Sequence, residues 1–377
     1  MWDEPSLPRD FILKGGVLDR KSWKDDHVLS VGTRLDHKLH WALGQVRHGL
    51  KPSLARFGRW LARRCGGVAE QSKDCETECE IVSRYWSEQF TAMRKDGSYW
   101  LNNKIVEEST YRLMTDTPTH WLTWLLDDYL DGKTFSRSLS ICCGDGAHEI
   151  QLYRSGRVKT VTGVDISDGA IRQARERFRE AGATAEQYRF DIGDVNHLRV
   201  DGRFDLILST GALHHTTNLE SLLKTLQEAL TPEGYFVMVE FIGPNRFQWT
   251  DRQIEVINRI LGALDPVYLK EGRHAQFERP TIESMMKSDP SEAVRSQDVY
   301  RLVVQRFNVV YQRFYNGTVV HQLHPLLRSE FVNRQRKDFD SIIRLILLTE
   351  DLLVANDVLP SDFVFLICRQ RNVGVSA

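Results

Sequence analysis

The sequence predicts an α/β protein with a mostly parallel sheet of seven strands in a Rossmann-like arrangement. From Ser138 onward, short apolar runs alternate with helical patterns. Strands that alternate with helices form parallel sheets covered by helices on both faces. The apolar runs lie at 138–142, 159–164, 187–192, 204–209 and 235–240. The clearest helical pattern between them places five leucines on one face: Leu219, Leu222, Leu223, Leu226 and Leu230.

Two later strands complete the predicted sheet. Residues 307–313 and 363–369 have strand-like patterns, and the segment Phe339–Asn356 between them has a helical one. A last strand that returns antiparallel brings the sheet to seven strands. An insertion at about 243–306 separates the fifth strand from this pair, and we expect it to form a lid that recognises the substrate.

The chain of 377 residues is longer than one average domain, and its first part differs from the rest. Residues 1–80 are predicted to be a basic, largely helical extension, and residues 81–135 a helical segment that roofs a ligand pocket. Within the extension, residues 40–67 hold six Lys or Arg and no acid. Apolar residues fall there at helical spacing: Leu54, Phe57, Trp60 and Leu61. Such a helix can lie on an anionic membrane or contact a partner; the alternative is a helix packed on its own domain, with its arginines in water.

The bulk composition narrows the functional classes. The formal net charge of −1 gives no general attraction to nucleic acid, so no nucleic-acid partner is expected. No run of about 18 apolar residues is present, and the first residues carry acids and prolines where a secretory signal needs a basic and then an apolar stretch. We therefore expect a cytoplasmic protein, with peripheral membrane contact through residues 40–67 left open. The six cysteines lack paired CxxC spacing, so neither a disulfide framework nor a metal site is predicted.

A glycine-rich turn follows the first strand. The strand runs through Cys142 into Gly144 and Gly146 and then into a helix, a pattern typical of a nucleotide cradle. The second strand ends in Asp165, about 20 residues further on, from where a carboxylate reaches ribose hydroxyls. A helix N-cap at Asp165 or Ser167 is the alternative, and the two roles are compatible.

Further candidate cofactor contacts come at the ends of the next strands. Asp194 follows the third strand and is placed to accept a hydrogen bond from the exocyclic amine of adenine, with Ile166 and Val195 as neighbouring contacts. Thr210 ends the fourth strand, at the carboxyl edge where ligands bind in open α/β sheets.

Together these residues resemble the class I methyltransferases that depend on S-adenosylmethionine. The resemblance covers about Ser138 to Glu240 and includes Gly193-Asp194, the run Phe204–Ile207 and the block Leu230-Thr-Pro-Glu-Gly234. It implies the class I fold for residues 136–377 and S-adenosylmethionine as cofactor. Dinucleotide-binding oxidoreductases share the glycine-rich turn and the acid after strand two, but not the Leu-Thr-Pro-Glu-Gly block.

A closer likeness extends into the later chain. The blocks starting at Gly243-Pro-Asn-Arg246, Asp289-Pro-Ser-Glu292 and Tyr315-Asn-Gly317 resemble a bacterial subgroup associated with surface-polysaccharide biosynthesis. By analogy, this resemblance implies O-methylation of a sugar-bearing or other small acceptor.

The sequence departs from the family at two positions. Ser140 stands where an acid is common, and Cys142 stands where the first glycine of the turn is usual. Glu149, early in the following helix, is the candidate to take over the contact with the methionine ammonium; stabilisation of the helix dipole is its alternative role. The departures keep open a second function, a catalytically inactive cofactor-binding scaffold in a membrane-associated biosynthetic assembly.

The catalytic candidates are His214 and His215, just after the fourth strand, because histidine can take a proton from an acceptor hydroxyl near neutral pH. The alternative is that one packs under a helix and the other caps a loop. Residues of the later blocks are candidate substrate contacts, or members of an internal ion-pair network between the blocks: Arg246, Trp249, Glu240, Glu292 and Arg295.

Overall fold

The computed structural model describes residues 77–96, 99–270, 276–328, 331 and 336–371. All of them belong to one compact unit, Lys73–Ala377. The predicted basic helix at 40–67, and nearly all of the extension to which it belongs, lie outside the described residues. Within the described part of the chain, no helix has both the length and the apolar character needed to cross a bilayer.

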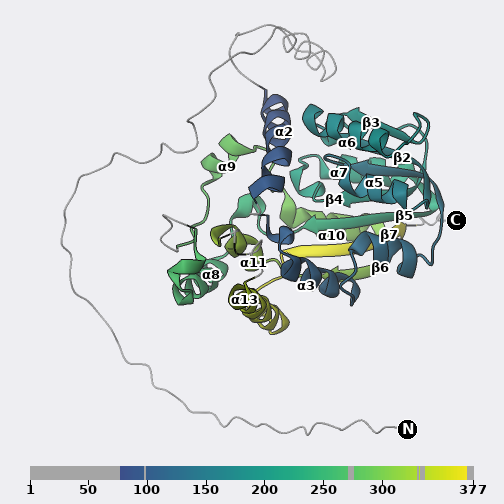
Figure 1. Cartoon of the computed structure of the whole chain (residues 1–377). Coiled ribbons are helices and arrows are strands. Elements are labelled where there is room, and N and C mark those ends of the chain that lie inside the picture. The colour runs from purple at the N-terminus through teal and green to yellow at the C-terminus, as the bar shows by residue number, and fades with distance from the viewer. Residues whose placement is uncertain (1–76, 97–98, 271–275, 329–330, 332–335, 372–377) are drawn as a thin grey trace, which may run out of the picture. The chain divides into compact units, whose positions relative to one another are not determined.

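A seven-stranded sheet in the order β3-β2-β1-β4-β5-β7-β6 forms the centre of the fold (Figure 1). The first five strands are parallel, and β7 runs antiparallel to both of its neighbours. The α/β fold class and the antiparallel last strand are therefore confirmed. The strands are β1 Phe135–Ile141, β2 Val158–Asp165, β3 Tyr188–Ile192, β4 Phe204–Thr210, β5 Leu230–Phe241, β6 Phe307–Phe314 and β7 Phe363–Gln370.

Strand β5 begins earlier than the apolar run at 235–240 predicted. Leu230 pairs with Phe204, the next pair is Leu206 with Tyr235, and the register shifts between them. The intervening Thr-Pro-Glu-Gly residues therefore bulge out of the ladder, as expected for a stretch rich in turn formers.

Helices cover both faces of the sheet. Successive side chains along β4 point to opposite faces, so this strand contributes apolar residues to the core on each side. Leu206 and Leu208 belong to the core that includes α5 (Ala147–Arg154) and α6 (Asp168–Glu180), whereas Ile207 belongs to the opposite core. That second core contains the leucine face of α7 (Leu219–Ala229) and the buried side of α10 (Ser296–Arg306).

The remaining elements lie before β1, after β5 and between β6 and β7. Helix α2 (Glu78–Asp96) packs on α6, where the hydroxyls of Ser87 and Ser167 lie 2.8 Å apart. Before β1 come η1 (Trp100–Asn102), α3 (Lys104–Thr115), α4 (Trp121–Trp124) and the π-helical turn η2 (Leu125–Tyr129). The insertion after β5 contains η5 (Asn245–Phe247), α8 (Asp251–Ala263), η6 (Pro266–Tyr268), α9 (Ile282–Ser288) and α10. Helices α11 (Val320–Leu323) and α13 (Lys337–Ala355) lie between β6 and β7.

Candidate active site

The turn after β1 has a strained, closely packed backbone. Cys142, Gly144 and Gly146 all have positive φ, at 48°, 55° and 73°. A Cβ added at Gly146 would lie 3.0 Å from the Cβ of Ala174, so this position needs glycine for space as well as conformation. Cys142 adopts the left-handed conformation despite its side chain, at a cost of about 1–2 kcal/mol. The turn thus keeps the shape of a cradle although cysteine replaces the usual glycine.

Asp165 joins the ends of β1 and β2. Its buried carboxylate accepts hydrogen bonds from the N–H of Gly144 at 2.9 Å and of Ser167 at 2.8 Å. Burial raises the pKa of Asp165 to about 6, although the two N–H bonds act in the opposite direction. The N-cap role belongs to Ser167, whose Oγ accepts from the N–H of Ala170 at 3.1 Å. Contact of Asp165 with ribose stays a prediction.

Asp194 lies at the end of β3 and caps the short helix η3 (Val195–His197). Its Oδ1 accepts from the N–H of Asn196 at 2.8 Å, and its Oδ2 lies 4.0 Å from the Sγ of Cys79 on α2. Val195 is buried, whereas Ile166 and Thr210 are half-buried at the ends of their strands. All four predicted contacts therefore lie at the carboxyl edge.

Two buried polar atoms near the turn have no hydrogen-bond partner among the described residues. They are Oε2 of Glu149, in the first turn of α5, and Oγ of Ser140, on β1. Burial raises the pKa of Glu149 to about 7; the nearby Ser140 hydroxyl acts against this shift, and the charges of Asp145 and Asp165 add to it. A buried carboxylate with an unsatisfied oxygen is costly unless a ligand completes its bonding.

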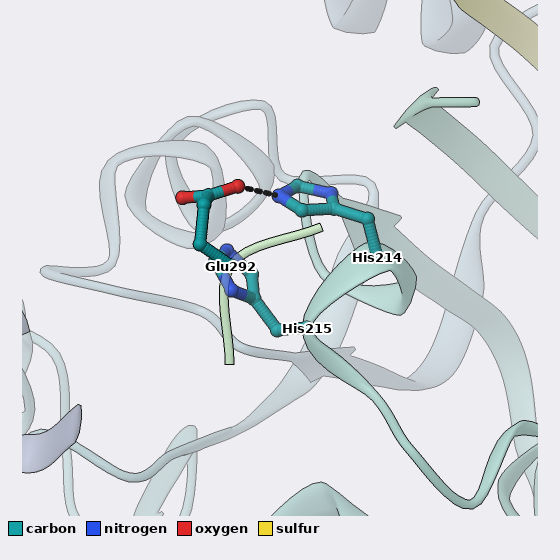
Figure 2. Close-up of side chains that lie close together, drawn as sticks. All are labelled: His214, His215 and Glu292. Atoms are coloured by element: carbon teal, nitrogen blue, oxygen red, sulfur yellow. Dashed lines mark ion pairs between the residues drawn. The ribbon is translucent and has the colours of Figure 1, made fainter. Parts of the chain in front are cut away.

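His214 is held between two carboxylates. It lies on the turn η4 (Leu213–His215), directly after β4, and Figure 2 shows its ring facing Glu292. Its Nδ1 contacts Oε1 of Glu240, and its Nε2 lies 3.3 Å from Oε1 of Glu292. Burial alone lowers the pKa of His214, but the two carboxylates outweigh burial and raise it to about 10. The catalytic role predicted for His214 stays a prediction.

His215 has a different environment. Its Nδ1 lies 3.1 Å from Oγ of Ser291 and 3.9 Å from Oδ2 of Asp289. Trp86, on α2, packs edge-on against its ring at 5.2 Å and donates from Nε1 to Asp289 at 3.0 Å. Burial, and then the charge of His214, lower the pKa of His215.

Glu240 is placed differently from the predicted substrate contact. Its Oε2 accepts from the N–H groups of Ala212 at 2.9 Å and Leu213 at 2.7 Å. Its Oε1 accepts from the N–H of Phe241 at 2.8 Å and contacts His214. The side chain is 1% exposed, so both oxygens serve to fix η4 and His214 rather than to meet a substrate.

Arg246 joins the two sequence blocks through main-chain carbonyls. Its Nη1 donates to the carbonyl of Pro290 at 2.7 Å and of Glu292 at 3.0 Å. The two blocks are therefore joined, but not by the predicted ion pair, because Arg246 contacts the main chain of Glu292 rather than its carboxylate. Glu292 itself faces His214, as described above.

Two other substrate candidates are occupied by contacts within the protein. Arg295 pairs with Glu220 at 2.8 Å and with Asp298 at 2.9 Å, which ties α10 to the start of α7. Trp249 is 6% exposed, and its ring stacks on Phe247 at 5.0 Å. These surroundings give both side chains structural roles, and the predicted substrate contacts stay predictions.

A family model described as "Methyltransferase domain" matches residues 136–300. This segment is a methyltransferase domain. The match starts at the second residue of β1 and ends in α10, so it contains the glycine-rich turn, Asp165, the histidine pair and Glu292. The cofactor of the domain is S-adenosylmethionine, as the sequence predicted.

Relatives of the methyltransferase domain are similar over part of the chain. An uncharacterised methyltransferase of Mycobacterium tuberculosis is 32% identical over 108 residues, 28% of this chain and 51% of that protein. A demethylmenaquinone methyltransferase of Leptospira interrogans is 26% identical over 191 residues, 48% of this chain and 72% of that protein. Among solved structures, the N-methyltransferase NodS of Bradyrhizobium japonicum with S-adenosylhomocysteine has 15% identity and a TM-score of 0.37, over 71% of this chain and 98% of that one. The chain spans about half the length of the mycobacterial relative.

The sequence reasoning missed several residues of the methyltransferase site. Trp86 and Ser291 contact His215. His321 interacts electrostatically with Glu292 and His214. Trp86 and Asp289 are 203 positions apart, so no local pattern links them. Trp86 lies in the segment 81–135 that the sequence analysis predicted to roof the pocket.

Replacing Arg246 by alanine should lower the free energy of unfolding by about 1–3 kcal/mol, because two buried carbonyls lose a charged donor. Urea denaturation measures this change, and Arg252→Ala is the matched control, since Arg252 forms an exposed pair with Glu255. An unchanged stability with a raised Michaelis constant for the acceptor would instead restore the predicted substrate role.

Proposed function

We propose that the chain transfers a methyl group from S-adenosylmethionine to a hydroxyl oxygen of a sugar-bearing or other small acceptor. The observation that carries this proposal is the cluster of His214, His215 and Glu292 at the end of β4. Strand β4 is the direct neighbour of β1, which leads into the glycine-rich turn. A group that can withdraw a hydroxyl proton therefore stands beside the cofactor cradle.

The residues at the turn fit the cofactor. The unpartnered Oε2 of Glu149 suits a cationic ammonium. Asp165 would contact the ribose hydroxyls, and Asp194 would accept from the adenine amine. The bound cofactor supplies an activated methyl group on its sulfonium. The acceptor oxygen would take this methyl group from sulfur with release of S-adenosylhomocysteine, and its proton would pass to the cluster of histidines and Glu292. The protein therefore mainly aligns the acceptor, excludes water and helps remove this proton.

The acceptor class rests on the resemblance of the later sequence blocks. They are similar to methyltransferases associated with surface-polysaccharide synthesis, which favours a glycan hydroxyl as the methylated group. Contact of residues 40–67 with a membrane or a partner would bring the domain to a membrane-associated acceptor, and this contact stays a proposal.

The test combines binding and turnover. Calorimetry should show S-adenosylmethionine and S-adenosylhomocysteine binding with micromolar affinity, and Asp165→Ala should weaken it on the order of 100-fold, because the turn loses a buried acceptor of two N–H groups. Incubation with labelled cofactor and a panel of glycan acceptors should then yield labelled methyl ethers. Binding without transfer to any hydroxyl acceptor would favour the scaffold, and absence of binding by folded protein would refute the cofactor site.

A further inference from the structure

We propose that His214, His215 and Glu292 bind a divalent transition-metal ion, with Zn²⁺ as the best fit, and that its open coordination position receives the acceptor hydroxyl. The binding of the ion stands on the geometry alone; the role of the open position rests on the proposed function.

The three side chains converge closely enough to share one ion. A ring nitrogen of each histidine and one carboxylate oxygen of Glu292 all lie within 4.8 Å of one another (Figure 2). The 3.3 Å between Nε2 of His214 and Oε1 of Glu292 suits two ligands of one zinc ion, because tetrahedral bonds of about 2.0–2.1 Å place neighbouring ligand atoms about 3.3 Å apart.

The second ring nitrogen of each histidine makes the kind of contact that is usual in metal-binding histidines. Nδ1 of His214 is bound by the carboxylate of Glu240, and Nδ1 of His215 by the hydroxyl of Ser291. That hydroxyl is in turn held by Oδ1 of Asp289 at 2.7 Å. Metal-binding histidines almost always engage their second ring nitrogen in this way, which fixes the ring and leaves the other nitrogen free for the ion.

The charge of the cluster favours a dication. Glu240 and Asp289 are 1% and 2% exposed, and the side chain of Glu292 is 16% exposed. Among the described residues, these carboxylates form their ion pairs with the two histidines. Arg246 interacts electrostatically with Asp289 and Glu292, but its hydrogen bonds go to carbonyl oxygens. Three carboxylates in a largely buried site are costly without compensating positive charge.

A third histidine borders the cluster. His321 on α11 interacts electrostatically with Glu292 and His214, and its Nδ1 is buried without a hydrogen-bond partner among the described residues. An unsatisfied imidazole beside three converging ligands is expected where a further ligand, such as a metal-held hydroxyl or water, completes the bonding. Three protein ligands with one open position are the arrangement of catalytic zinc sites, which lower the pKa of a bound hydroxyl.

The competing account is a metal-free network in which a proton on His214 bridges Glu240 and Glu292. The two accounts differ in what the purified protein binds. Tag-free full-length protein, dialysed against a chelator and then against buffer, should bind one Zn²⁺ per chain by calorimetry. Co²⁺ in place of Zn²⁺ should give visible absorption bands typical of a tetrahedral or five-coordinate site. Mg²⁺ should bind far more weakly, because this ion prefers oxygen ligands.

Variants then locate the ion. His215→Ala and Glu292→Gln should each weaken Zn²⁺ binding at least 100-fold, whereas exposed His197→Ala and exposed Glu283→Gln should leave it unchanged. Circular dichroism shows whether each variant is folded. The stoichiometry of Zn²⁺ binding is measured on the wild-type chain, so that part of the test does not depend on any variant. Absence of stoichiometric Zn²⁺ binding by wild type, or equal binding by His215→Ala and Glu292→Gln, would overturn the inference in favour of the proton-bridged network.

A failure of this inference is distinguishable from a failure of the proposed function. If chelator-treated, metal-free protein still binds S-adenosylmethionine and methylates hydroxyl acceptors at full rate, the proposed function holds and the inferred role of the ion is refuted. If the protein binds Zn²⁺ in the cluster but transfers no methyl group to oxygen, the metal site is supported and the proposed function is refuted.

Discussion

Replacing Glu240 by alanine should lower the free energy of unfolding by about 3–5 kcal/mol, the loss typical of removing one partner from a buried charged network. The side chain is 1% exposed, and its two oxygens accept three backbone N–H groups besides contacting His214. The substitution leaves these donors unsatisfied and opens a cavity at the end of β5. Urea denaturation with an unchanged m-value would show the loss as a shift of the midpoint.

Two further variants separate the network from the strand. Glu240→Gln keeps the shape and one good acceptor but places an amide nitrogen against hydrogen-bond donors, so an intermediate loss is expected. Glu233→Ala is the matched control on the same strand, because that glutamate is 85% exposed and pairs only with Arg369 at the surface. A loss below about 1 kcal/mol for Glu240→Ala would show that η4 and His214 are held by other contacts.

The sequence was sufficient to predict the sheet because helical patterns separate most of the apolar runs from β1 to β5, although only the short turn η3 lies between β3 and β4. The antiparallel β7 was also predictable, since a late apolar run follows a long helix. The start of β5 was not, because the pairing of Leu230 with Phe204 depends on a register that skips the Thr-Pro-Glu-Gly bulge. Periodicity indicates which face a residue takes, but not where a ladder is interrupted.

The candidate site was predictable only in part, and the two histidines show why. His214 and His215 are adjacent in sequence, yet the pKa of the first is raised and that of the second is lowered. The difference comes from Glu240, Glu292 and Asp289, which reach the pair from β5 and from the loop after α9. Contacts between such distant segments leave no trace in local spacing. For the same reason the cysteine count gave no indication of the ligand set formed by these histidines and Glu292.

Cofactor affinity should fall as the pH drops through about 7. In the cofactor-free protein, burial raises the pKa of Glu149 to about 7, and a cationic ammonium beside its unpartnered oxygen would lower that pKa again. Binding therefore releases a proton below pH 7, and the affinity decreases with each unit of acidification. Calorimetry between about pH 5 and 8, in buffers of different ionisation enthalpy, measures both the affinity and the proton release.

Glu149→Gln tests which carboxylate is responsible. At pH 8 the variant should bind S-adenosylmethionine about 10–100-fold more weakly, because a charge-assisted bond is lost. Its remaining pH dependence should shift to about 6, the pKa to which burial raises Asp165. An unchanged profile would place the ammonium elsewhere and leave Glu149 as a helix-dipole residue.

The same variant should be more stable than wild type when no cofactor is bound. A carboxyl group whose pKa is higher in the folded protein stabilises the fold at low pH, and this contribution is lost as the pH rises through about 7. At pH 8 the folded wild-type protein must hold a buried, unsatisfied negative charge at Glu149, whereas the glutamine amide of the variant is neutral. A variant that gains thermal stability while it loses cofactor affinity would show that Glu149 is retained for its ligand, since a residue serving only the helix would lose stability instead.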